Sequence, residues 1–142
     1  MMMMKKSAIL VFICSLFATS CLGSIWRKTN VKINNNLPAG TTLTVHCKSK
    51  NDDLGTRHVK GSWGFSFTTH VFGVTLFYCS FKWPGQFHWF DIYVQNRDKE
   101  ECHNCVWEIL PNGPCRLNRE TGRFDACYPW NPPSQLRGKP LI

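Results

Sequence analysis

The stretch that most constrains the fold is residues 74–94, VTLFYCSFKWPGQFHWFDIYV, which has the pattern of two strands joined by a tight turn. Side chains of a strand point alternately to opposite faces, and aromatic and β-branched residues favour a pleated, buried surface. Both halves of the stretch alternate and are rich in such residues. Between them, Trp83-Pro84-Gly85-Gln86 suits a turn, because proline fixes φ and glycine tolerates positive φ. We therefore predict a central, buried hairpin.

Shorter alternating runs on either side of this stretch predict further strands. They are Val31–Ile33, Thr42–Cys47, Gly61–Phe67, Cys105–Ile109, Cys115–Leu117 and Arg123–Cys127. Two charged segments between them, Lys48–Gly55 and Gln95–Cys102, are predicted to be loops. Seven or eight short strands without a helical period indicate an all-β fold, a small β-sandwich of antiparallel strands.

The N-terminus has the composition of a secretory signal peptide. A lysine pair precedes the apolar run Ser7–Phe17, which is too short to span a bilayer comfortably, and small residues follow it. Cleavage could follow Ser20 or Gly23. We favour Gly23, because cleavage there leaves an even set of six cysteines. Cleavage after Ser20 would leave Cys21 as an odd thiol or, in a bacterium, as a candidate for a lipid anchor.

The remaining chain predicts one domain, residues 24–130, and a flexible proline-rich tail, residues 131–142, next to a Trp130 pinned to the domain. Losing the two lysines of the signal peptide lowers the net charge from +8 to +6. Positive charge favours acidic partners, but the basic residues are scattered, which argues against nucleic-acid binding. We expect a secreted, extracellular monomer without stable membrane insertion.

The six remaining cysteines are expected to form disulfides within the chain, because secretion leads to an oxidising compartment. Cys102-x-x-Cys105 also has the spacing of zinc ligands, but an oxidising compartment removes free thiolates, so we expect no metal. The sequence does not choose among the possible pairings. The six are Cys47, Cys79, Cys102, Cys105, Cys115 and Cys127.

Other polar and aromatic groupings are better explained by structure than by chemistry. His46, Ser80 and Asp91 would form a catalytic triad only if the fold brought them together, which their spacing does not indicate. The acidic loop at residues 51–53 lacks the alternation and the distal glutamate of an EF-hand, so we favour a loop stabilised by its own Asx turns over calcium binding. Most aromatic residues alternate within strands and are expected in the core, whereas Trp83, in a turn, is expected to be an exposed anchor. We expect no enzyme activity and no cofactor.

Seven motifs occur along the chain between about Val31 and Trp130. They are HCKSKNDDLG (46–55), GSWGFSF (61–67), LFYCSFKW (76–83), WFDIYVQNRD (89–98), CHNCVWEI (102–109), NGPC (112–115) and CYPW (127–130). In this order and spacing they resemble the plant self-incompatibility protein family, the S-protein homologues. One departure is that the acidic loop has two acidic residues where a third is common in the family. The resemblance implies a secreted, disulfide-bonded β-sandwich without enzymatic activity, and the founding members are stigmatic ligands of a pollen receptor.

The leading interpretation is therefore a secreted recognition protein that binds a cell-surface receptor protein. The alternative is a basic, cysteine-rich defence protein that acts directly on microbes, which the positive charge motivates. Loops on a rigid scaffold tolerate change, so we expect recognition by the loops at 48–55, 83–86, 95–102 and 117–123. The candidate contact residues are Asn51, Asp52, Asp53, Trp83, Arg97, Asp98, Lys99 and Arg119. Replacing loop residues such as Arg97 and Asp98 is expected to leave folding intact.

Overall fold

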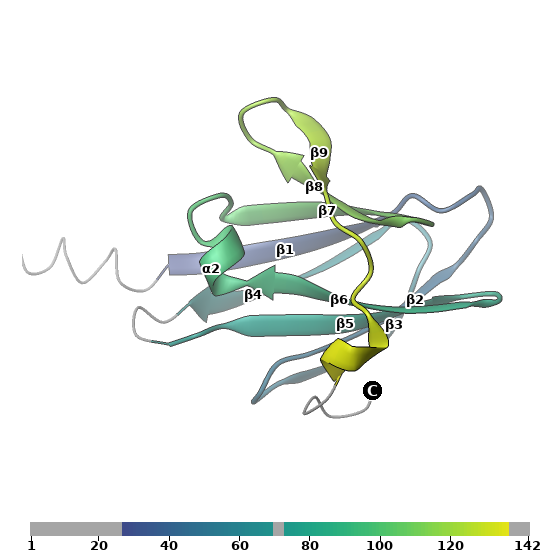
Figure 1. Ribbon diagram of the computed structural model, residues 1–142, viewed down its shortest axis with the longest axis horizontal. Coiled ribbons are helices and arrows are strands. Elements are labelled where there is room, and N and C mark those ends of the chain that lie inside the picture. The colour runs from purple at the N-terminus through teal and green to yellow at the C-terminus, as the bar shows by residue number, and fades with distance from the viewer. Residues whose placement is uncertain (1–26, 70–72, 137–142) are drawn as a thin grey trace, which may run out of the picture.

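The computed structural model describes residues 27–69 and 73–136, which form two β-sheets around one hydrophobic core (Figure 1). One sheet has five strands in the order β4-β1-β7-β8-β9, and the other has four in the order β3-β2-β5-β6. The strands are β1 (Arg27–Asn35), β2 (Leu43–Lys48), β3 (Asp53–Val59), β4 (Ser62–Thr69), β5 (Leu76–Trp83), β6 (Gln86–Val94), β7 (Asn104–Leu110), β8 (Gly113–Asn118) and β9 (Arg123–Cys127). A short helix, α2 (Gln95–Asp98), follows β6, and a 3-10 turn, η1 (Pro133–Leu136), comes last. The predicted all-β fold is confirmed.

The central hairpin is confirmed as β5 and β6, which pair antiparallel from Leu76↔Val94 to Trp83↔Gln86. Gly85 in the turn has φ 76°, the conformation for which glycine was predicted there. Phe77 and Phe81 of β5 face the core, with 4% and 0% of their surface exposed. Burial of these large rings between the two sheets makes the hairpin a main contributor to the core.

The five-stranded sheet supplies the other half of the core. Val31 and Ile33 of β1 lie beside Trp107 and Ile109 of β7, and none of the four exposes more than 1% of its surface. The alternation predicted for both strands is therefore confirmed. β1 and β7 pair parallel, however, so the expectation of antiparallel strands holds for the other ladders and is wrong for this one.

The structure departs from the sequence prediction in two more places. The described residues form nine strands, because β3 begins at Asp53, inside the segment expected to be a charged loop. Residues of β3 are mostly exposed, so the strand lacks the hydrophobic alternation that reveals a strand. The second charged loop, expected at 95–102, begins with the helix α2, which is only four residues long and too short to show a helical period.

All six predicted cysteines pair within the chain, as expected. Cys47–Cys79 joins β2 to β5, and Cys115–Cys127 joins β8 to β9. Cys102–Cys105 closes the turn that leads into β7. Two disulfides thus join neighbouring strands within the two sheets, and the third fixes the chain where it passes from α2 to the five-stranded sheet.

The chain after β9 runs back across the sandwich (Figure 1). Trp130 is pinned as expected, since its Nε1 donates to the Pro111 carbonyl at 3.1 Å. Asn131 N donates to the Trp89 carbonyl of β6 at 2.8 Å. The predicted signal peptide and the last six residues of the predicted tail lie outside the described residues. Within residues 27–69 and 73–136, no helix combines the length and the apolar character needed to cross a membrane.

Candidate recognition site

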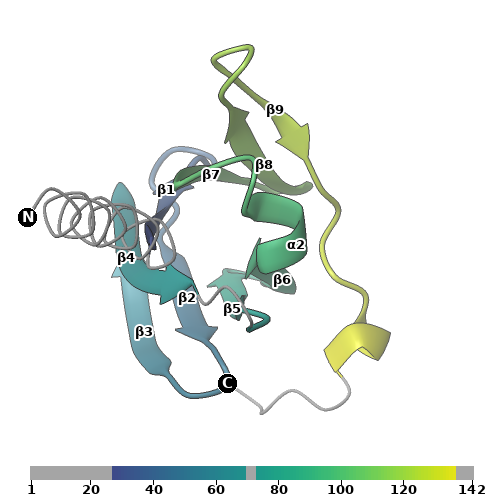
Figure 2. The same ribbon diagram turned by 90° about the vertical axis from the view of Figure 1, so that its left-hand side faces the viewer.

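Three of the four loops predicted to carry recognition lie at one end of the sandwich, here called the loop end. They are the β2–β3 turn (residues 49–52), the segment from α2 to β7 (residues 99–103) and the β8–β9 turn (residues 119–122). Figure 2 faces this end, with α2 between the two sheets and the β8–β9 hairpin projecting from them. The β5–β6 turn lies at the opposite end, here called the hairpin end, because β5 and β6 run the full length of the sandwich.

The β2–β3 turn is held by short-range hydrogen bonds. Ser49 N donates to the Asp52 carbonyl at 2.8 Å, and Asp52 N donates to Ser49 Oγ at 3.1 Å. Asn51 and Asp52 are exposed, as expected of contact residues. Among residues 27–69 and 73–136 no group of three or more histidine, cysteine or acidic side chains is arranged to hold a metal ion.

Asp53 has a structural partner on the neighbouring strand. Its Oδ1 lies 2.6 Å from His46 Nε2 and accepts a hydrogen bond from Gly55 N at 2.9 Å. The hydrogen bond with His46 is the main cause, and the one from Gly55 N the second, that lowers the pKa of Asp53 from 3.8 to about 2. Asp53, a predicted contact residue, is therefore an exposed carboxylate that links the start of β3 to β2.

Asp98 is completely buried, so its prediction as an exposed loop residue is wrong. Its carboxylate accepts hydrogen bonds from Val94 N at 2.8 Å, from Arg97 Nε at 2.9 Å, from Arg97 Nη2 at 2.7 Å and from Arg116 Nη1. Its backbone carbonyl accepts from the amides of Glu101 and Cys102, each at 3.0 Å. A buried carboxylate with two guanidinium partners fixes α2 against β8.

Arg97 is also committed to this network, and its prediction as a free contact residue is wrong. Its Nη2 donates to the Asp91 carbonyl at 2.8 Å. Its guanidinium carbon lies 5.1 Å from the ring centre of Phe90, 5.2 Å from that of Trp107 and 4.9 Å from that of Tyr128. Cation–π attraction and hydrogen bonds together hold this side chain over the aromatic core. We call Arg97, Asp98 and Arg116 the anchor triad.

Two basic candidates at the loop end remain exposed, Lys99 just after α2 and Arg119 in the β8–β9 turn. The turn is rigid at its tip, where Gly122 N donates to the Asn118 carbonyl at 2.8 Å. His103 lies near Arg119, and burial together with nearby arginines lowers the pKa of His103. The loop end therefore presents exposed side chains of both charges, with Lys99 and Arg119 beside Glu100, Glu101 and Glu120.

Trp83 is only partly exposed, which corrects its prediction as an exposed anchor. It is the last residue of β5, and its ring centre lies 5.1 Å from that of His88 and 6.1 Å from that of Trp130. His88 in turn stacks on Trp130 at 4.7 Å and 12°. This aromatic cluster packs at the hairpin end and holds the chain that follows β9 against β5 and β6.

The geometry does not assemble the catalytic triad considered above. His46 and Ser80 face each other on β2 and β5, but the ring nitrogens of His46 lie 2.6 Å from Asp53 and 3.5 Å from Thr56 Oγ1. Ser80 exposes only 6% of its surface. The arrangement suits sheet packing.

Sequence reasoning missed Arg116, because a buried partner 18 residues from Asp98 leaves no local signal.

The comparisons with known proteins agree with this architecture. The family model described as plant self-incompatibility protein S1 matches residues 30–130. S-protein homolog 2 of Arabidopsis thaliana is 54% identical to the chain over 111 residues, which cover 73% of the chain and 69% of that protein. S-protein homolog 5 of Arabidopsis thaliana is 45% identical over 132 residues, which cover 89% of the chain and 99% of that protein.

One solved structure shares the fold. It is described as a self-incompatibility protein homologue from a widespread family of small, highly stable, secreted plant proteins. The TM-score is 0.52 at 18% sequence identity, and the match covers 75% of the chain and 97% of the solved protein. At this identity the likeness establishes the arrangement of the strands.

Proposed function

The chain belongs to the plant self-incompatibility protein S1 family, and on this basis we propose that it is a secreted, non-enzymatic ligand that binds a cell-surface receptor protein through its loop end. Secretion is supported by the signal-peptide pattern and by the three disulfides, which suit an oxidising compartment.

The observation that carries the proposal is the construction of the loop end. Two turns, one from each sheet, and the segment after α2 all lie at this end, and the anchor triad holds α2 between the sheets. A binding surface fixed before the partner arrives loses little conformational entropy on binding. Exposed side chains on such a surface can change without disturbing the core, which suits a family of ligands with different partners.

The test compares two triple variants with the same change in charge. The loop-end variant carries Asn51→Ala, Lys99→Ala and Arg119→Ala. Its matched control carries three exposed residues away from the loop end, Asn112→Ala, Lys60→Ala and Lys82→Ala. Each variant loses one amide and two positive charges, so a general effect of charge is the same in both.

Saturable binding of the labelled proteins to plant cells is then measured. We expect the loop-end variant to bind at least about tenfold more weakly and the control to bind like the wild type, since contact charges act locally. Equal binding by all three proteins would exclude the loop end as the contact surface. Equal weakening of both variants, with leakage of anionic liposomes by the wild type, would instead support the defence function.

A further inference from the structure

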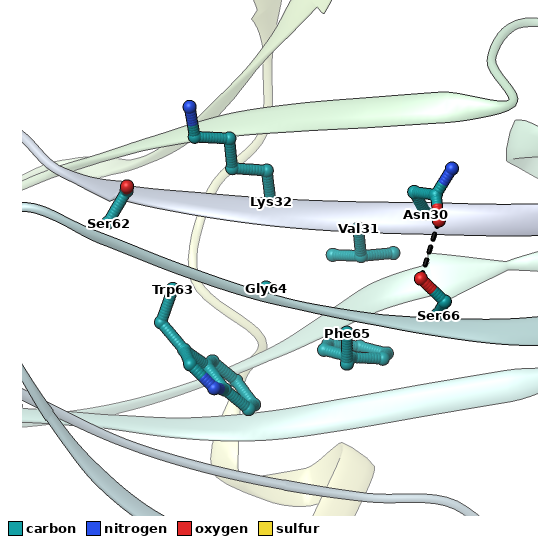
Figure 3. A pocket seen from close by; sticks show the side chains of 8 residues that line it. All are labelled: Asn30, Val31, Lys32, Ser62, Trp63, Gly64, Phe65 and Ser66. Atoms are coloured by element: carbon teal, nitrogen blue, oxygen red, sulfur yellow. Dashed lines mark hydrogen bonds between the residues drawn. The ribbon is translucent and has the colours of Figure 1, made fainter.

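A hollow of about 370 Å³, lined by both polar and apolar residues, lies on the five-stranded sheet (Figure 3). It runs between β1 and the edge strand β4. The side chains of Lys32 and Ser62 point to one side of the sheet, whereas Val31, Trp63 and Phe65 point to the other. This volume lies in the lower part of the range of ligand sites, roughly 300–1,000 Å³.

Gly64 forms the floor of the hollow. It pairs with Lys32, and a Cβ atom built on it would lie 2.5 Å from the Val31 carbonyl oxygen. The strands thus approach more closely here than a side chain would permit. The sheet surface stays bare at this point, while its backbone groups lie within the antiparallel β1–β4 ladder.

A hydrogen-bonded line of side chains borders the hollow and crosses three strands. Ser66 Oγ donates to Asn30 Oδ1 at 2.5 Å, and Asn30 Nδ2 donates to Asn104 Oδ1 at 2.7 Å. This line fixes the orientation of the Asn30 amide and leaves lone pairs of Ser66 Oγ and Asn30 Oδ1 as acceptors. The acceptors are therefore oriented before any ligand arrives.

Lys32 supplies the positive charge of the hollow. It is exposed, and within residues 27–69 and 73–136 its ammonium group has no ion pair. Ser62, also exposed, adds a hydroxyl that can donate or accept. The hollow thus combines one cation with hydroxyl and amide groups, beside the partly buried Trp63 and Phe65 that also line it.

From these observations we propose that the hollow binds a sugar that carries a carboxylate, as one unit of an acidic oligosaccharide built from uronic acids. Lys32 pairs with the carboxylate, and Ser62, Ser66 and Asn30 exchange hydrogen bonds with the sugar hydroxyls. A sugar matches this set because its hydroxyls both donate and accept. An acidic peptide matches it less well, because it offers a carboxylate but not the neighbouring hydroxyls that Ser62, Ser66 and Asn30 can meet.

This inference goes beyond the receptor proposal and does not depend on it, because the hollow contains none of the three loop-end residues changed above. The probe is a linear oligomer of galacturonic acid, and its fully methyl-esterified form is the neutral match. Binding to the full secreted protein is measured by calorimetry, and the contact residues are mapped by amide chemical shifts. The variant Lys32→Gln removes the charge, and Lys82→Gln removes an exposed lysine from the other sheet.

We expect the acidic oligomer to shift the amides of Lys32, Ser62, Gly64 and Ser66. Lys32→Gln should weaken binding about tenfold, the loss of one charge-assisted hydrogen bond, and Lys82→Gln should change it less than twofold. The methyl ester should bind equally weakly to the wild type and to Lys32→Gln, since it has no carboxylate for the lysine.

Four results would overturn the inference. They are no binding at millimolar oligomer, shifts centred away from these residues, an equal effect of both lysine variants, and tighter binding of a glutamate-rich peptide of the same charge at the same amides. The loop-end triple variant should bind the oligomer like the wild type. Its behaviour toward cells therefore tests the receptor proposal separately.

Discussion

Replacing Asp98 with alanine should be among the most destabilising single changes in this protein, although sequence reasoning places this residue on an exposed loop. The carboxylate is completely buried and pairs with two guanidinium groups, whose side chains are 7% exposed at Arg116 and 21% exposed at Arg97. Removing one partner of a buried ion pair costs about 3–5 kcal/mol, because the remaining charge is left without compensation. Such a loss is a large part of a total stability of ~5–15 kcal/mol.

The assay is urea unfolding of the oxidised protein, followed by tryptophan fluorescence. Lys99→Ala is the matched control, because this exposed neighbour should change the free energy of unfolding by under about 0.5 kcal/mol. The double variant Asp98→Ala/Arg116→Met tests the mechanism. If the uncompensated charge causes the loss, the double variant should lose less free energy of unfolding than the two single variants lose in sum. A loss below about 1 kcal/mol for Asp98→Ala, or strict additivity, would refute the reasoning.

Three further predictions concern a backbone contact, a carboxylate and a disulfide. Gly113→Ala should lower the free energy of unfolding by at least about 2 kcal/mol, because φ is +144° and a Cβ would lie 2.2 Å from the Tyr128 carbonyl oxygen. Gly122→Ala is the control and should lower the free energy of unfolding less, because the space around Gly122 is open. The pKa of Asp53 is about 2 in the folded protein against an ordinary 3.8, so its stabilisation should be present above pH 3.8 and vanish as the pH falls through 2. In acid-unfolding curves the difference in stability between Asp53→Asn and the wild type should disappear over that range, and a difference that persists below pH 2 would contradict this. Brief reduction and alkylation, read by mass spectrometry, should open Cys115–Cys127 before Cys47–Cys79, because Cys127 is exposed whereas Cys47 and Cys79 are fully buried. The reverse order would show that accessibility does not decide which disulfide is reduced first.

The central hairpin could be predicted because its signals are local. Phe77 and Phe81 alternate with other residues over one strand, and Gly85 marks the turn within the same short stretch. Each of these features depends on neighbours in sequence, so no knowledge of the remaining fold is needed. The same reasoning succeeds for β1 and β7, whose inward residues alternate with more exposed ones.

The strand β3 and the parallel ladder could not be predicted, for two different reasons. β3 is an edge strand with little burial, so its sequence, DLGTRHV, has no apolar face to read. The pairing of β1 with β7 joins segments more than 70 residues apart, Asn30 with Asn104 at its start. Such a partner is selected by the packing of the whole sandwich, and strand patterns carry no information on which distant strand is adjacent.

The positions of most candidate loops could be predicted from the sequence, but the surroundings of their side chains could not. Charge in the segment after β6 suggested solvent exposure, since aspartate and arginine are mostly found at the surface. Arg97 and Asp98 are the exception because they meet Arg116 and an aromatic core, and each charge is then satisfied. Only the tertiary structure brings the third member of the triad to the other two.

The anchor triad has a consequence for recognition. With Arg97 and Asp98 committed to the interior, the exposed contact residues of the loop end lie on two turns that belong to different sheets, at 49–52 and 119–122, and at Lys99 just after α2. A partner that touches both turns is sensitive to how the two sheets are placed relative to each other. The helix α2 joins the sheets at this end, and the triad holds it against β8. A change in the triad that leaves the strands intact should therefore weaken receptor binding without altering any residue of the contact surface.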